Sequence, residues 1–283
     1  MKLFRHGIEG HENPGVVADD GSLRDLTGIV ADIAGDALSD TSLAILRGLD
    51  RDALPIVPAE TRIGACVGRV GKLVCVGLNY VAHAAEAQQA APAEPLLFLK
   101  ATTAICGPYD TVMLAKHARK VDWEVELGVV IGSVCRYVTE EDATNYIAGY
   151  CVVNDVSDRF YQLEGTGQWV KGKSNDSYAP VGPWLVTRDE VENPSGRSIW
   201  LDVDGHRYQN GNTADMVFNV PQLVSYISNL MTLMPGDIIA TGTPSGVGIG
   251  QQPHPIYLHA GQVMTLGIDG LGQQSQRVVD WTQ

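Results

Sequence analysis

The sequence predicts an α+β protein that is mostly β, with a small α/β domain over residues 1–69 and a larger domain over residues 70–283. Short runs of β-branched and apolar residues, bounded by glycine, proline and asparagine, recur along the whole chain. Only one long helical pattern has clear start and stop signals. The first domain shows short strand patterns and one helix, and no motif of catalytic chemistry.

Composition limits the possible partners. The net charge of −13 argues against binding to nucleic acid or to an anionic membrane. No apolar run reaches the roughly 18 residues needed to cross a bilayer, and the start MKLFRHGIEG lacks the features of a signal peptide. The five cysteines are widely spaced without a C-x-x-C pair, as expected for buried thiols in a reducing compartment. We therefore expect a cytoplasmic protein.

In the first domain, residues 2–5 and 16–18 are predicted strands separated by turn residues. Residues 36–48 have the pattern of an amphipathic helix, with Ser39, Asp40 or Thr41 as its N-cap. The apolar runs over residues 72–77 and 96–100 predict two further strands. Between them lie a helix over residues 81–88 and a loop of small residues and prolines over residues 90–95, a candidate lid.

Further along, Thr139 and Asp142 have the spacing of a capping box at the start of a short helix. The apolar run that follows predicts a strand ending on Asp155. Residues 218–233, opened by Asn219 and Pro221, form the clearest helix. The remaining predicted strands cover residues 200–204, 238–243 and 262–268.

The glycine-rich loop over residues 241–248 directly follows a predicted strand. It lacks the Walker lysine and the dinucleotide-binding spacing, so it does not indicate a nucleotide site.

The most informative stretch is VDWEVELGVVI, residues 121–131, which is predicted as a strand. Asp122, Glu124 and Glu126 alternate along it, so their carboxylates point to one face of the sheet. Neighbouring acids repel and resist ionisation unless a cation lies between them. A solvated acidic face is the commoner origin of an isolated E-x-E pattern, so this strand alone leaves both interpretations open.

Other polar groups cluster at strand ends in the same half of the chain. Asp155 is followed by Arg159 and Gln162 at helical spacing. His83 and Glu86, three residues apart after a strand, share one helix face. Two lysines, at positions 171 and 173, lie in a glycine-containing loop.

Taken together and in this order, these motifs resemble the fumarylacetoacetate hydrolase superfamily over residues 70–250. The stretches that carry the resemblance are GLNYVAHAAEA, PLLFLKATTAICGPYD, VDWEVELGVVIG, GYCVVNDVSDRFYQ, QWVKGKSNDSYAPVGPWLVT and MPGDIIATGTPSGVG. The resemblance is greatest to bacterial acylpyruvate hydrolases and 2,4-diketo-3-deoxy sugar-acid hydrolases. It implies a mixed β-roll with few helices, a small N-terminal domain, and a homodimer or a dimer of dimers.

The resemblance also implies a metal site. Glu124, Glu126 and Asp155 match the three carboxylates that hold Mg²⁺ in the family, or Mn²⁺ or Ca²⁺ in its place. Oxygen ligands suit such hard cations. Asp122 then lies beside the metal ligands without being one of them.

The remaining matched positions imply catalytic and substrate-binding roles. His83 and Glu86 match the pair that activates water, and Lys173 matches a group that stabilises an enolate. Arg159 and Gln162 match residues around the oxoacid end of the substrate. Thr243 lies in the loop that contacts the substrate carboxylate.

The implied reaction is hydrolysis of a C–C bond in a 2,4-dioxo acid, giving pyruvate and a carboxylic acid. The alternatives on the same metal–enolate platform are decarboxylation of oxaloacetate, isomerisation of a 2-hydroxymuconate-type acid, and cleavage of ureidoglycolate. A cation-binding protein without activity is a fourth. Phe160 and Asn175 depart from the family pattern at positions expected beside the acyl group, so the acyl group stays open.

Overall fold

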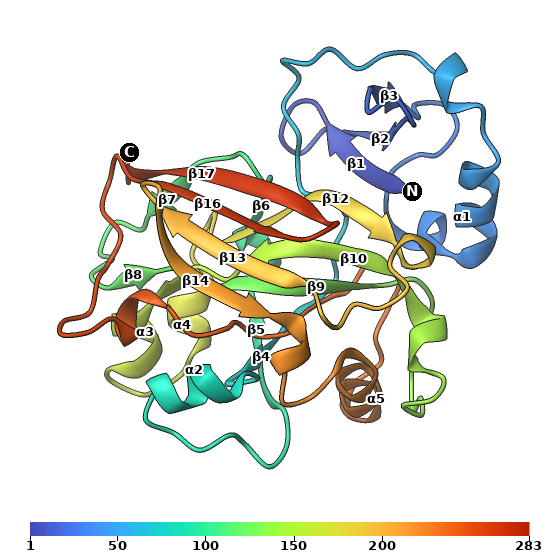
Figure 1. Ribbon diagram of the computed structural model, residues 1–283. Coiled ribbons are helices and arrows are strands. Elements are labelled where there is room, and N and C mark those ends of the chain that lie inside the picture. The colour runs from blue at the N-terminus through green and yellow to red at the C-terminus, as the bar shows by residue number, and fades with distance from the viewer. Residues whose placement is uncertain (283) are drawn as a thin grey trace.

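The computed structural model describes residues 1–282 and shows a mostly β fold with few helices, which confirms the predicted fold class (Figure 1). A ten-stranded sheet has the strand order β3-β2-β1-β12-β10-β9-β15-β4-β5, with β6 paired to β12 at the side. Its strands are β1 (Lys2–His6), β2 (Asn13–Val17), β3 (Leu23–Asp25), β4 (Leu73–Gly77), β5 (Leu96–Lys100), β6 (Ile105–Cys106), β9 (Val125–Ile131), β10 (Ile147–Asn154), β12 (Ala179–Thr187) and β15 (Ile238–Ala240).

A five-stranded sheet, in the order β14-β13-β16-β17-β7, lies across the middle of the larger one (Figure 1). Its strands are β13 (Ser198–Val203), β14 (His206–Asn212), β16 (Val263–Ile268), β17 (Gly272–Asp280) and β7 (Val112–Leu114). A third sheet consists of the short strands β8 (Val121–Asp122) and β11 (Ser157–Asp158).

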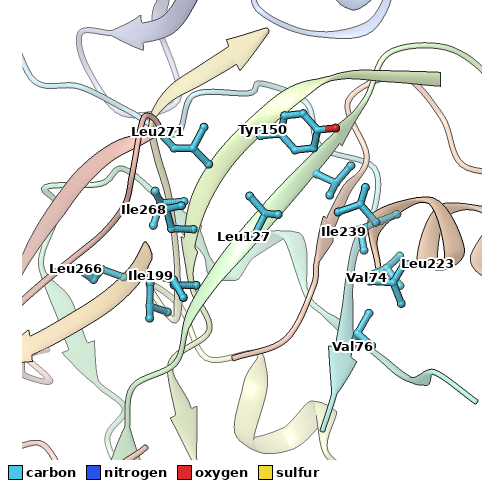
Figure 2. Close-up of a cluster of buried hydrophobic side chains, with 14 of the residues drawn as sticks. Val74, Val76, Leu127, Tyr150, Ile199, Leu223, Ile239, Leu266, Ile268 and Leu271 are labelled. Carbon is cyan, nitrogen blue, oxygen red and sulfur yellow. The ribbon is translucent and has the colours of Figure 1, made fainter. Parts of the chain in front are cut away.

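The main core lies between the two large sheets. Figure 2 shows Leu127 of β9 between two groups of this cluster: Ile199 and Ile268 of the smaller sheet on one side, and Ile239 with Leu223 on the other. Every residue of β9 and β10 is buried, because these central strands are covered on both faces. Their near-continuous apolar sequence follows from that position. The core therefore fixes the two strands whose ends carry the predicted metal ligands.

The helices are α1 (Asp40–Arg47), α2 (Val81–Glu86), α3 (Arg159–Leu163), α4 (Val170–Lys173) and α5 (Val220–Leu230). Ser39 caps α1 as predicted, accepting the N–H of Ser42. Asn219 and Gln222 form a capping box at the start of α5, and Leu223 packs into the core (Figure 2). None of the helices within residues 1–282 combines the length and apolarity of a membrane span.

Two local predictions need correction. The N–H of Asp142 donates to Thr139 Oγ1 as a capping box requires, but Asp142 Oδ2 accepts from the Thr139 hydroxyl instead of its N–H, and the short helix that follows is a 3-10 helix at Ala143–Tyr146. The predicted strand over residues 121–131 is broken after Asp122: β8 pairs with β11, and β9 begins only at Val125. The break separates Asp122 from the other two acids of the motif.

The N-terminal segment continues the large sheet, because β1 pairs with β12 in the register Leu3↔Leu185. An ionic cluster also ties this segment to the rest of the chain. Arg62 pairs with Glu12 at 3.0 Å and with Asp110 at 2.6 Å. The domain boundary near residue 69 stays a prediction.

Candidate active site

Three carboxylates meet at the ends of the central strands. Glu126 lies in β9, Glu124 immediately precedes it, and Asp155 directly follows β10. The antiparallel pairing of β9 with β10 places Val153 opposite Glu126. One hydrogen bond continues this pairing beyond the strand ends: the N–H of Asp155 donates to the carbonyl of Glu124 over 2.8 Å. One ligand oxygen from each acid lies within 4.8 Å of the others, and all three residues are buried.

Cations surround two of these acids. Lys173 donates to Glu124 Oε2 at 2.7 Å and to Asp155 Oδ2 at 2.8 Å. Lys100 donates to Asp155 Oδ1 at 2.5 Å. Arg159 donates through Nη2 to Glu124 Oε1 at 2.5 Å. Burial opposes ionisation of Glu124, but the charges of Arg159 and Lys173 more than offset it and hold its pKa well below the usual range.

Lys100 is a site residue that the sequence interpretation missed. Its side chain is fully buried, at the end of the apolar strand β5. A lysine inside the predicted strand LLFLK was a usable signal, because a buried lysine requires a charged or polar partner. The two lysines of the predicted loop have different positions. Lys173 contacts the acids of the site, whereas Lys171 is exposed and donates to Thr166.

Glu126 differs from its neighbours, since no lysine or arginine of residues 1–282 forms an ion pair with it. Its carboxylate accepts the backbone N–H of Gly242 at 2.8 Å. Burial, together with the charges of Asp155 and Glu124, raises the pKa of Glu126 well above its usual range.

The residues present fit a divalent cation. Four buried acids (Asp122, Glu124, Glu126 and Asp155) lie among three buried cations (Lys100, Lys173 and Arg159), and none of these cations forms an ion pair with Glu126, so ionisation of Glu126 calls for one further cation. The donor set is all oxygen, which Mg²⁺, Mn²⁺ and Ca²⁺ prefer. The identity of the metal remains a prediction.

Asp122 is not one of the three candidate metal ligands, but it holds their neighbours in place. Its Oδ1 accepts from Arg159 Nε at 2.7 Å, and its Oδ2 accepts the N–H of Ile249 at 2.8 Å. Burial raises the pKa of Asp122 to about 6, although Arg159 opposes the shift. Arg159 also donates to Gln162 Oε1 at 2.9 Å. Each of its three guanidinium nitrogens therefore contacts a side chain of the site.

The predicted dyad lies on α2. His83 Nδ1 and Glu86 Oε2 are 3.1 Å apart, and Glu86 Oε1 accepts the N–H of Gly246 at 2.9 Å. The start of α2 is held by the buried Asn79, whose amide donates to the carbonyl of Thr241 at 2.7 Å. With the Nδ1 proton directed at Glu86, the Nε2 atom of His83 is the one able to accept a proton.

The glycine-rich loop after β15 braces the acids of the site. Through Gly242, Gly246 and Ile249 it donates three backbone N–H groups to Glu126, Glu86 and Asp122. Just beyond these residues, Gly250 lies so close to Glu86 that a Cβ at this position would be 2.2 Å from Cδ of Glu86, so any larger residue would displace the Glu86 side chain.

Thr243, in the same loop, has its hydroxyl engaged within the protein. Its Oγ1 donates to the carbonyl of Val125 at 2.9 Å and accepts from Gln209 at 2.7 Å. The predicted contact of this loop with a substrate carboxylate remains untested.

Every predicted site residue except Asp155 lines one cavity of about 250 Å³. Asp155 lies behind it, in contact with Lys173 and Lys100. The sequence interpretation missed the apolar wall of the cavity, which consists of Val76, Phe98, Leu163, Trp169, Val247 and Ile249. Phe160 and Asn175 are not among the lining residues described within residues 1–282, and their place beside the acyl group stays a prediction. Phe160 packs instead beneath the guanidinium of Arg119.

A mostly β fold brings a buried acidic triad and a histidine–glutamate pair together beside one cavity, which is the arrangement of an enzyme active site. Residues 72–279 match the family described as fumarylacetoacetate (FAA) hydrolase C-terminal. The chain belongs to the fumarylacetoacetate hydrolase family, which confirms the resemblance seen in the sequence.

Similar proteins include both hydrolases and isomerases. A Burkholderia multivorans protein named "Putative hydrolase" is 59% identical over 276 residues, which are 98% of each chain. The maleylpyruvate hydrolase structure from Sphingobium sp. SYK-6 is 33% identical with a TM-score of 0.81, covering 99% of this chain and 100% of that one. The 2-hydroxyhepta-2,4-diene-1,7-dioate isomerase structure from Mycobacterium marinum is 32% identical with a TM-score of 0.78, covering 100% of both chains.

Proposed function

We propose that this protein hydrolyses the C3–C4 bond of a 2,4-dioxo acid, an acylpyruvate or a 2,4-diketo-3-deoxy sugar acid, to pyruvate and a carboxylic acid. The observation that carries the proposal is the placement of the His83–Glu86 pair on the same cavity as Glu124 and Glu126. A base and an oxygen-ligand metal site facing one space are what a water attack on a chelating substrate requires.

Glu124, Glu126 and Asp155 would hold the divalent cation. When bound, the cation supplies electrostatic stabilisation of negative charge on the 2-oxo acid end of the substrate. Lys173, at the floor of the cavity, adds a positive charge at the same end. Arg159 holds Glu124 in place, Gln162 accepts a hydrogen bond from Arg159, and both complete the polar floor.

His83 would perform the proton transfer. Its Nε2 accepts a proton from water as the water oxygen bonds to C4, and Glu86 stabilises the imidazolium that forms. The C3–C4 bond then breaks, C4 leaves as a carboxylic acid, and its bonding electrons pass to C3 as the enolate of pyruvate. Protonation of C3 completes the balance. A general base of this kind typically contributes ~10²–10⁴-fold to the rate.

Isomerisation is the second candidate, favoured by the similarity to the Mycobacterium marinum isomerase structure. Isomerisation of a 2-hydroxydienoic acid moves a proton between carbons and needs no attacking water. Decarboxylation of oxaloacetate likewise needs only the stabilised enolate. The His83–Glu86 pair favours hydrolysis over isomerisation and decarboxylation, because only hydrolysis needs a base that activates water. Glu86 is also held in place by the N–H of Gly246.

The test is a panel of 2,4-dioxo acids with Mg²⁺ or Mn²⁺, in which lactate dehydrogenase and NADH report pyruvate. We expect pyruvate from several acylpyruvates, and competitive inhibition by oxalate, which mimics the planar enolate. His83→Ala should lower kcat for hydrolysis by about 10²–10⁴-fold and spare any oxaloacetate decarboxylation. Absence of pyruvate from every 2,4-dioxo acid, with turnover of a muconate or of ureidoglycolate, would reject the hydrolase assignment.

A further inference from the structure

The cavity is charged at its floor and neutral at its mouth. Its floor contains Glu126 and Lys173, whose exposed fractions are 2% and 1%. Its mouth is formed by residues that are exposed to solvent, the amides Gln88, Gln89 and Gln252 among them. A substrate that places its oxoacid end on the floor must therefore direct its acyl end toward these amides.

Positive charge is confined to the floor. Within residues 1–282, the arginine and lysine side chains lining the cavity are Arg159 and Lys173, which are exposed by 5% and 1%. Both are paired with Glu124. The only other basic group of the lining, His83, faces Glu86. Among the lining residues that the structure describes, the mouth therefore offers no cation to an anionic group at the far end of a substrate.

A second carboxylate would be poorly accommodated at this mouth. Recognised carboxylates in proteins pair with arginine or lysine, often through two parallel hydrogen bonds. Moving an unpaired carboxylate from water to a partly apolar wall costs free energy. The charge of Glu86 on the same cavity and the net charge of −13 add repulsion. Amides, in contrast, donate and accept hydrogen bonds with uncharged oxygen atoms.

We infer, building on the proposed hydrolysis, that the acyl group of the substrate is uncharged: the enzyme selects 2,4-dioxo monoacids and rejects diacids of the same length. Selectivity lies in the three glutamines at the mouth, which come from two separate segments, the residues just after α2 and the loop between β15 and β16. The cavity of about 250 Å³ is smaller than the roughly 300–1,000 Å³ of drug-sized ligand sites, in keeping with a short acyl chain.

A matched pair of substrates tests this inference. 2,4-Dioxoheptanoate and 2,4-dioxoheptanedioate have the same carbon chain, differ by the terminal carboxylate, and both release pyruvate when the C3–C4 bond is cleaved. With the Mg²⁺-loaded enzyme we expect kcat/KM for the monoacid to exceed that for the diacid at least tenfold. Equal values, or a preference for the diacid, would overturn the inference and leave the hydrolase function intact.

Variants at the mouth locate the selectivity. Gln252→Lys adds a cation there, and Gln252→Met is the neutral control of similar length. We expect the diacid-to-monoacid ratio of kcat/KM to be at least tenfold higher in the lysine variant than in the methionine variant, and Gln89→Lys to shift it likewise. An unchanged ratio in both lysine variants would show that the acyl end does not meet this mouth.

Binding gives a readout that does not depend on turnover. Calorimetric titration of both acids into the Mg²⁺-loaded enzyme should show at least tenfold tighter binding of the monoacid, also in the slow His83→Ala variant. If neither acid released pyruvate, the proposed hydrolysis would fail, whereas tighter binding of the monoacid would still support the inference. Equal binding would overturn it.

Discussion

The backbone N–H of Gly246 donates to Oε1 of Glu86 over 2.9 Å, so the glutamate that orients His83 is itself held from a loop 160 residues away in sequence. The same loop places Gly250 against Glu86, where a Cβ would come within 2.2 Å of the carboxyl carbon. The backbone of this loop therefore positions the His83–Glu86 pair. Substitutions in the loop should change the geometry of the pair even though both of its side chains are kept.

Gly250→Ala should reduce hydrolysis without unfolding the protein. The flexible end of Glu86 can move away from the new methyl group, which disturbs its hydrogen bond to His83. We expect kcat to fall about tenfold or more. This is less than the ~10²–10⁴-fold lost when a general base is removed, because His83 itself remains. Gly48→Ala is the control, because its Cβ would meet nothing closer than 3.5 Å. Full activity in the Gly250→Ala variant would show that the position of Glu86 is not critical.

Removal of the metal should abolish turnover, and Mg²⁺ or Mn²⁺ should restore it after dialysis against EDTA. Glu126→Gln should weaken Mg²⁺ binding at least tenfold by calorimetry, since it removes the acid of the triad that forms no ion pair with a lysine or arginine of residues 1–282. The exposed Glu141→Gln is the matched control. Unchanged Mg²⁺ affinity in the Glu126 variant would contradict the assignment of this acid as a ligand.

Lys100→Met should destabilise the fold. The substitution removes the partner of a buried ion pair and leaves Asp155 Oδ1 without its 2.5 Å donor. Breaking such a pair from one side typically costs about 3–5 kcal/mol, which urea unfolding would measure. Lys2→Met, at an exposed position, is the control. Mg²⁺ should recover part of the lost stability, because a cation bound beside Asp155 again offsets its charge.

Glu12 should contribute to stability in a pH-dependent way. Burial opposes its ionisation, but hydrogen bonding and attraction from Arg62 and Arg5 hold its pKa below the usual 4.5. A lowered pKa in the folded state stabilises the protein above pH 4.5, and that stabilisation is lost as the pH falls through the folded-state pKa. Glu12→Gln should therefore unfold at lower urea than the wild type at pH 7, and the difference should shrink at pH 3. A constant difference would rule out this linkage.

The metal-site prediction depended on strand ends, which sequence patterns locate well. Glu124, Glu126 and Asp155 each lie at or beside the end of an apolar run, and antiparallel pairing of β9 with β10 brings such ends together. Lys100 was missed because its partner Asp155 is 55 residues away and follows β10, a strand that is not a neighbour of β5 in the sheet. Spacing along the chain carries no information about that contact.

Two other misjudgements have similar causes. Strict alternation placed Asp122 in one continuous strand with Glu124, but pairing of Asp122 with Ser157 in a separate sheet interrupts it. The sequence identified the glycine-rich loop as part of the site, yet it could not reveal that the backbone N–H groups of Gly242 and Gly246 contact the protein's own acids. Which carboxylate a loop amide reaches is decided by tertiary packing alone.

The strand order also has a consequence for biosynthesis. β9 carries Glu126, and one of its edges pairs with β15, whose residues follow more than a hundred positions later. A ribosome adding roughly 5–20 residues per second leaves that apolar edge without its neighbour for several seconds or more. We therefore expect the nascent chain to need protection from aggregation until residues 238–240 emerge, and the catalytic centre to be among the last parts to assemble.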